Sequence, residues 1–137
     1  MSLSSIPRGL REVVFARDHG RCQYCHLAQY GHGAVFHIDH IVPRSKGGAT
    51  VLTNLALQCP NCSLRKANKV MGRDQSNGDP IALFHPLQQE WSEHFRIEAE
   101  GNCSGLTPTG QATVEALRMN DPIPRIARAC QIRLGLI

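Results

Sequence analysis

Four cysteines stand in two Cys-x-x-Cys pairs, and an Asp-His dipeptide lies between the pairs. The pairs are Cys22 with Cys25 and Cys59 with Cys62, and 33 residues separate them. Two intervening residues let both sulfurs of a pair reach one ion at about 2.3 Å, and two pairs complete a tetrahedron. The spacing therefore predicts a closed, structural Zn²⁺ site that holds the start of this segment to its end. Redox motifs are the alternative, but a redox Cys-x-x-Cys normally accompanies a βαβ pattern, which is lacking here.

The dipeptide Asp39-His40 offers acid–base and metal chemistry. His40 is neutral near pH 7 and can take a proton from water. Asp39 is a hard oxygen ligand suited to Mg²⁺ or Mn²⁺, an ion that stabilises charge on a phosphate and its leaving oxygen. Asn54, fourteen residues after His40, can hold a backbone carbonyl or the imidazole and thereby orient the base. A surface or core pair without chemistry is the alternative for Asp39 and His40 when they are considered alone.

The elements expected around these residues alternate between helices and strands. Residues 7–18 have helical apolar spacing, with Ser4 or Ser5 as possible caps, and residues 36–42 are rich in β-branched residues. The remaining expectations are a polar loop at 44–53, a strand at 55–57, a short helix carrying Leu64 to Lys69, a linker at 72–80, a helix at 86–95, a hairpin of 96–99 with 103–106, and helices at 107–120 and 126–134. Cys103 and Cys130 are expected to be small buried side chains.

The basic residues are concentrated in the first half of the chain. Residues 1–73 hold ten Lys/Arg and three Asp/Glu, whereas residues 74–137 hold five and eight. This asymmetry suggests a polyanionic partner for the first half. No apolar run approaches the ~18 residues of a membrane span, and the N-terminus lacks the pattern of a signal peptide. We therefore expect a cytoplasmic protein without a membrane partner, and the sequence does not indicate its oligomeric state.

From Cys22 onward the chain resembles the HNH endonuclease family, in its bacterial form with a four-cysteine zinc site. The matching residues are Cys22, Cys25, His37-Ile-Asp39-His40-Ile-Val-Pro43, Ser45-Lys-Gly-Gly48, Asn54-Leu55, Cys59, Cys62 and Lys66. The resemblance implies an α+β protein with a ββα-metal core. Residues 1–72 would form an N-terminal helix and this zinc-clamped core, and residues 73–137 a mainly helical extension packed on it.

The resemblance also implies a metal-dependent endonuclease that hydrolyses DNA phosphodiester bonds. His40 would be the general base and Asp39 the ligand of a catalytic Mg²⁺ or Mn²⁺. Asn54 would be the central Asn of the H-N-H triplet, which orients the loop that carries the general base. His37 would contact the metal ligands without binding the ion itself. Basic residues that flank the site can contact DNA phosphates, which positions the duplex without reading its sequence. They are Arg44, Lys46, Arg65, Lys66 and Lys69.

Ser63 departs from the family pattern. The family usually has Asn or His directly after the last cysteine, as a further metal ligand. The hydroxyl of Ser63 is a poorer ligand, but at this position it can still coordinate the catalytic Mg²⁺ or hold a bound water. This departure supports an alternative function, a zinc-stabilised nucleic-acid-binding module with weak or lost cleavage. A third interpretation is a purely structural zinc protein that acts through protein contacts.

Overall fold

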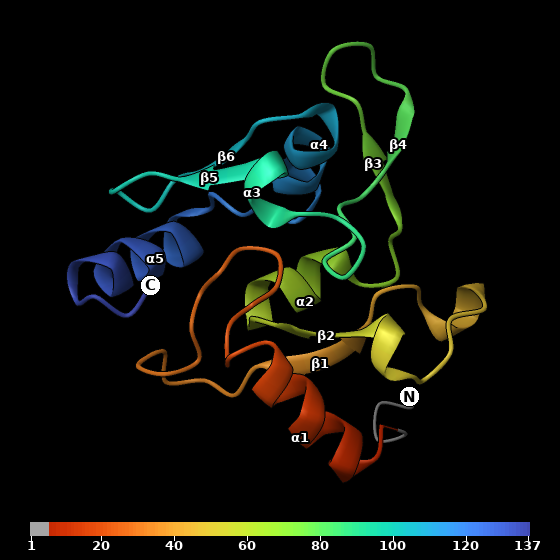
Figure 1. The fold of residues 1–137 in the computed structure, drawn as a ribbon. Helices are drawn as coiled ribbons and strands as arrows, with labels where there is room; N and C mark the ends of the chain where they lie inside the picture. The colour runs from red at the N-terminus through yellow and green to blue at the C-terminus, as the bar shows by residue number, and fades with distance from the viewer. Residues whose placement is uncertain (1–5) are drawn as a thin grey trace.

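The computed structural model describes residues 6–137, in which helices combine with two-stranded antiparallel sheets (Figure 1). The helices are α1 (Arg8–Arg17), α2 (Pro60–Lys66), α3 (Trp91–His94), α4 (Pro108–Ala116) and α5 (Pro122–Arg133). The strands are β1 (His37–His40), β2 (Leu55–Gln58), β3 (Met71–Arg73), β4 (Pro80–Ala82), β5 (Phe95–Ile97) and β6 (Cys103–Gly105). Within residues 6–137, no helix combines the length and apolar character needed to span a bilayer. Ser4 and Ser5 lie outside the described residues.

The hairpin of β1 and β2 is the centre of the first half of the chain. The two strands pair in a register that sets His37 opposite Gln58 and His40 opposite Leu55. Helix α1 lies along one side of the hairpin and α2 along the other (Figure 1). The order strand, loop, strand, helix confirms the predicted ββα core. Short 3₁₀ turns at Arg44–Lys46 and Leu52–Asn54 lie at the two ends of the segment that was predicted to be a polar loop.

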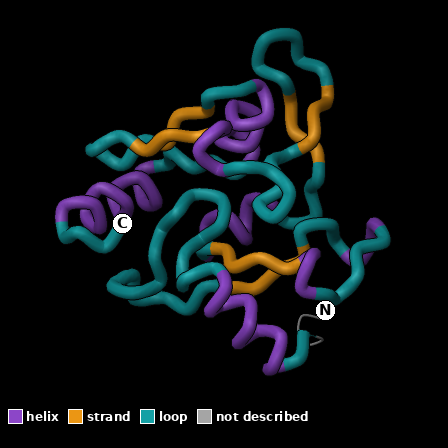
Figure 2. The backbone as a smooth tube through the Cα atoms, in the orientation of Figure 1, coloured by secondary structure: helices purple, strands orange, loops and turns teal. Residues whose placement is uncertain are grey.

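The end of α1 is fastened to β2 by an adjacent pair of opposite charges. Arg17 Nε lies 2.8 Å from Asp18 Oδ1, and Asp18 Oδ2 accepts a hydrogen bond from Leu57 N at 2.9 Å. Arg17 also donates to the carbonyl of Leu52 at 2.8 Å. Long loops, drawn in teal in Figure 2, then carry the chain from α1 to β1. Because Asp18 is buried, its hydrogen bond with Leu57 N holds the end of α1 against β2, and the first cysteine pair begins four residues later, at Cys22.

The second half of the chain shares a hydrophobic core with the first. Leu57 and Tyr24 belong to the same buried cluster as Phe84, Phe95 and Leu117. Polar contacts add to it across the same boundary. They are Trp91 Nε1 to Tyr24 O at 2.9 Å, Asn61 Nδ2 to Leu117 O at 3.1 Å, and Gln131 Oε1 and Nε2 to the backbone of Ala28 at 2.9 and 2.8 Å.

Several expectations about this half were wrong. The segment predicted as a linker at 72–80 instead contributes to the β3–β4 hairpin, in which Met71 pairs with Ala82. The helix predicted at 86–95 is confined to α3, whereas α5 begins four residues earlier than predicted, at Pro122. Cys103 is buried as expected, but Cys130 is exposed.

The hairpin of β5 and β6 is confirmed.

Candidate active site

The four cysteines of the two Cys-x-x-Cys pairs converge in the buried core. Their sulfur atoms all lie within 4.8 Å of one another, and Cys25 Sγ is 3.6 Å from Cys59 Sγ. Four thiolates bound to one Zn²⁺ at about 2.3 Å have sulfurs about 3.8 Å apart. A disulfide would need a separation of about 2.05 Å, and all four thiols are free. The donors therefore fit a tetrahedral zinc ion, as the spacing predicted.

The electrostatics of the cysteine cluster favour a bound cation. Hydrogen bonds with Cys22, then with Cys59 and Cys62, lower the pKa of the Cys25 thiol well below its usual value. The corresponding contacts, led by that with Cys22, raise the pKa of Cys62 well above it. Without a cation, ionisation of one of the four buried thiols therefore makes ionisation of its neighbours less favourable. A divalent ion removes this competition because it stabilises all four thiolates together.

Asp39, His37 and Ser63 form a polar cluster between β1 and α2. His37 and Asp39 are two residues apart on β1, so their side chains leave the strand on the same side. The hydroxyl of Ser63 lies 2.5 Å from Asp39 Oδ2 and 3.1 Å from His37 Nδ1. A carboxylate, a hydroxyl and an imidazole make a donor set that fits a divalent ion. Ser63, expected from its position to be a metal ligand, does lie against Asp39.

His40 ends β1, and its ring turns toward the loop that follows. His40 Nε2 lies 2.9 Å from the hydroxyl of Thr50, a residue that was not among the predicted site residues. Burial lowers the pKa of His40 below 6.5, the positive charge of Arg44 lowers it further, and the carboxylate of Asp39 opposes the shift. The imidazole is therefore uncharged at neutral pH and able to accept a proton.

Asn54 fastens the loop that follows His40. Its Nδ2 donates to Val42 O at 3.0 Å and to Ala49 O at 2.9 Å, while its Oδ1 accepts from Val42 N at 2.9 Å. We call these three hydrogen bonds the Asn54 clip. Gly48 lies against the clip, because a Cβ at this position would overlap Val42 O and lie 2.8 Å from Asn54 Nδ2. Asn54 thus holds backbone carbonyls, one of the two arrangements expected for it.

Lys66 occupies the interior below this loop. The side chain is buried, and its Nζ donates to Ile41 O at 2.8 Å and to His40 O at 3.4 Å. Burial lowers the pKa of Lys66 to about 8, against the raising effect of Asp39. The ammonium is therefore still protonated at neutral pH and holds the end of β1. This placement differs from the surface phosphate contact expected for Lys66.

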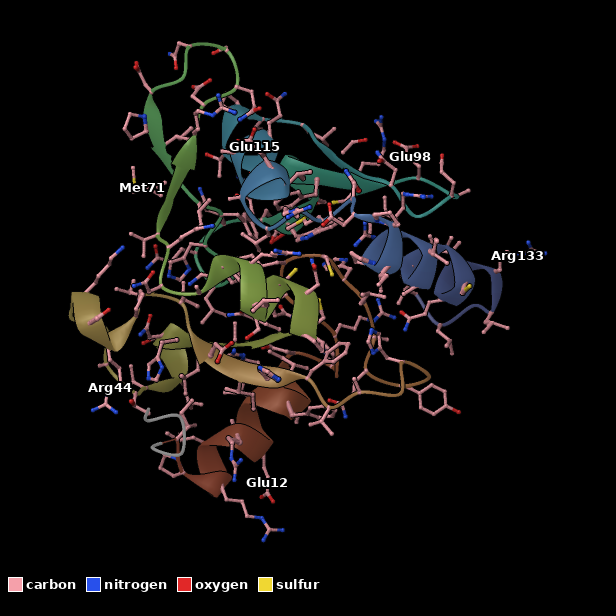
Figure 3. All side chains as sticks on the ribbon, turned by 180° about the vertical axis from the view of Figure 1, so that it is seen from behind. Glu12, Arg44, Met71, Glu98, Glu115 and Arg133 are labelled. Atoms are coloured by element: carbon pink, nitrogen blue, oxygen red, sulfur yellow. The ribbon has the colours of Figure 1, made fainter. Side chains whose placement is uncertain are left out.

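The other predicted DNA contacts lie nearer the surface. Arg44, Lys46 and Lys69 are exposed, and Figure 3 shows Arg44 pointing away from the body of the protein. Arg65 is partly buried, 3.9 Å from the carboxylate of Asp121. The labelled acidic residues Glu98 and Glu115 lie on the second half, well away from Arg44 (Figure 3).

A cavity that the sequence did not indicate lies beside β1. It has a volume of about 730 Å³ and is lined by His37 and Asp39 of β1 and by Arg8 and Arg11 of α1, among others. Arg8 and Arg11 therefore lie at the same cavity as Asp39, together with Glu12, whose carboxylate is 3.2 Å from Arg8 Nε. Their position at this cavity was not visible in the sequence because residues 8 and 11 are remote from the motif along the chain.

Arg128 is a second buried cation that sequence reasoning missed. It lies on α5 and donates through Nε to Gly101 O at 2.8 Å and through Nη2 to Met119 O at 2.6 Å. Its positive charge lowers the pKa of Cys25. The side chain therefore places positive charge near a four-thiolate cluster whose net charge is negative when zinc is bound.

Comparison with known proteins agrees with this geometry. Residues 22–69 match the family model described as HNH endonuclease. This segment begins at the first cysteine, ends after α2, and includes the polar cluster, His40 and the Asn54 clip. No curated protein matches the chain. Residues 22–69 are thus similar to HNH endonuclease domains, which suggests a nuclease or nucleic-acid-binding function, and the four-cysteine cluster adds a metal site within them.

Proposed function

We propose that the protein is a metal-dependent endonuclease that hydrolyses phosphodiester bonds of DNA. The observation that carries the proposal is the arrangement at the end of β1. There, the carboxylate of Asp39 faces Ser63 of α2 while the neighbouring His40, its pKa lowered, is held against Thr50. A carboxylate for a divalent ion and a base for water thus occupy neighbouring positions in the chain at the end of β1, within the matched segment.

His40 is the general base in this proposal. The tautomer that donates Nε2–H to Thr50 leaves the lone pair of Nδ1 available for the proton of the attacking water. Asn54 and Lys66 are positioning residues, because they hold the backbone at Val42 and Ile41, directly after the residue that carries the imidazole. A misplacement of about 1 Å can lower a rate about 100-fold, so this bracing supports catalysis.

Asp39 and Ser63 would hold the catalytic Mg²⁺ or Mn²⁺. When bound, such an ion stabilises the negative charge that develops on the phosphate and on the leaving oxygen. The structural Zn²⁺ at the four cysteines has a different task, because a site closed by four thiolates leaves no position for substrate. It joins the loop before β1 to the start of α2, and so holds Ser63 against Asp39.

The DNA backbone is expected to lie along the cavity beside β1. Arg11 shares this cavity with Asp39, and its positive charge is suited to a phosphate near the scissile one, whereas Arg8 is paired with Glu12 of the same cavity. Exposed Arg44 and Lys46 extend the basic surface at the other end of β1. These are backbone contacts without base readout, so the protein is expected to have weak sequence preference.

The second candidate function is that of a zinc-stabilised nucleic-acid-binding module that does not cleave. Ser63 is the observation that favours it, because its hydroxyl is a weaker ligand than the side chains usual at this position. In that case the polar cluster would bind no catalytic ion, and the basic residues would bind DNA without hydrolysis.

Nicking of supercoiled plasmid separates the two functions. The zinc-loaded protein is assayed with Mg²⁺, Mn²⁺ or Ni²⁺, beside His40→Ala and, as a matched surface control, His19→Ala. We expect nicking by the wild type and the control, and DNA binding without nicking by His40→Ala. Equal nicking by His40→Ala would refute His40 as the base. DNA binding by all three proteins with no nicking by any would favour the non-cleaving module.

A further inference from the structure

His37 occupies the place in the polar cluster that a metal ligand would occupy. It is an exposed residue at the start of β1, and its Nδ1 is 3.1 Å from Ser63 Oγ. The same hydroxyl is 2.5 Å from Asp39 Oδ2, so one oxygen atom touches both side chains. His37 and Asp39 also line the same cavity beside β1. An imidazole nitrogen and a carboxylate oxygen thus converge on one point at an open face.

The hydroxyl of Ser63 leaves this site short of one good ligand. A neutral hydroxyl that already donates to Asp39 adds little to the binding of a cation. Neutral imidazole is a common metal ligand through either ring nitrogen. His37, on β1, is near enough to supply the strong metal ligand that is absent at position 63 of α2.

We propose that His37 binds the catalytic divalent ion directly, together with Asp39, and so compensates for the weak ligand that Ser63 provides. The inference rests on the proposed function, because it concerns the ion of that reaction. It assigns His37 a direct contact, where the sequence suggested only support of other ligands.

A nitrogen ligand changes which ions the site prefers. Mg²⁺ favours oxygen ligands in near-ideal octahedral geometry, whereas imidazole suits Ni²⁺, Zn²⁺ and related transition ions better. We therefore expect the cluster to bind Mn²⁺ and Ni²⁺ more tightly than Mg²⁺. If His37 is removed, Ser63→Asn would supply an amide oxygen to the ion where His37 supplied a nitrogen. The preference of the site would then move back toward Mg²⁺.

Binding of Mn²⁺ to the zinc-loaded protein, in the absence of DNA, tests the proposal independently of activity. Free and bound Mn²⁺ are separated by electron paramagnetic resonance for wild type, His37→Ala, Asp39→Asn and His40→Ala. We expect His37→Ala to weaken Mn²⁺ binding about tenfold to hundredfold, and His40→Ala to leave it within about twofold. The exposure of His37 means that its substitution should not disturb folding, which circular dichroism checks.

Two further measurements distinguish a ligand from a residue that only orients Ser63. Pulsed resonance on bound Mn²⁺ should show coupling to ¹⁴N in wild type and in His40→Ala, and none in His37→Ala. The double variant His37→Ala/Ser63→Asn should regain divalent-ion binding and use Mg²⁺ better than wild type does.

Failure of this inference can be told from failure of the proposed function. If His37→Ala binds Mn²⁺ as wild type does while Asp39→Asn loses both binding and nicking, only the role of His37 is overturned. If wild type shows no Mn²⁺ binding, both the role of His37 and the metal-dependent reaction are overturned.

Discussion

Gly48 is the position at which a single methyl group should disable the site. A Cβ there would overlap Val42 O and come within 2.6 Å of Val42 C and 2.8 Å of Asn54 Nδ2. These atoms belong to the backbone and to the Asn54 clip, so no flexible side chain can move aside. Gly48→Ala must therefore displace the segment that follows His40.

The cost can be worked from the hydrogen bonds that this displacement breaks. Asn54 and Val42 share two of the three bonds of the clip, and each is worth about 1 kcal/mol net. Buried groups left without partners add about 1–3 kcal/mol. We expect Gly48→Ala to lower the free energy of unfolding by about 3 kcal/mol, and to lower the nicking rate about 100-fold through misplacement of His40.

Gly47→Asn is the matched control in the same turn. Gly47 has φ of +90° but nothing within 4 Å of a Cβ, and Asn tolerates positive φ better than most residues. Its cost should stay below about 1 kcal/mol. Urea unfolding of the zinc-loaded proteins measures the difference, and nicking is assayed in parallel. Equal stability and equal nicking for Gly48→Ala and Gly47→Asn would show that the clip does not position the base.

Three other predictions follow from single side chains. Cys59→Ala should release zinc and unfold the core, and retention of one zinc per chain with full helicity would contradict the four-thiolate site. The acid limb of the pH profile of the single-turnover rate should lie below pH 6.5, because the pKa of His40 is lowered. Arg44→Gln should move that limb to higher pH, because the positive charge of Arg44 contributes to the lowering. An unmoved limb would exclude Arg44 as a cause of the lowered pKa of His40. Arg128→Met should lower the free energy of unfolding by about 3 kcal/mol, since it leaves buried carbonyls without donors, and an unchanged urea midpoint would contradict this.

The core was predictable because its constraints lie in short stretches of sequence. The two cysteine pairs have ligand spacing, and the strand residues around Asp39 are β-branched. The turn between the strands ends at Asn54, whose clip reaches Ala49 and Val42, 5 and 12 positions earlier within the same connection. Such local signals predicted the zinc cluster and the ββα order, both of which are present.

The rest depended on contacts between distant residues. The segment 72–80 has the composition of a linker, yet its first residue packs on α4, where a Cβ on Gly72 would lie 3.3 Å from Ala112 Cβ. Pro122 and Pro124 resemble helix breakers, but they fall in the first turn of α5, where no backbone N–H needs an intrahelical partner. Lys66 looked like a surface cation, and only the fold shows that it is buried below the loop.

Anomalous diffraction from a crystal soaked in Mn²⁺ tests the central claim most directly. Besides zinc at the four cysteines, we predict a manganese peak in contact with the carboxylate of Asp39, on the side of β1 that faces Ser63. Soaking at a Mn²⁺ concentration that supports plasmid nicking, with no manganese at Asp39, would contradict the assignment of this cluster as the catalytic centre.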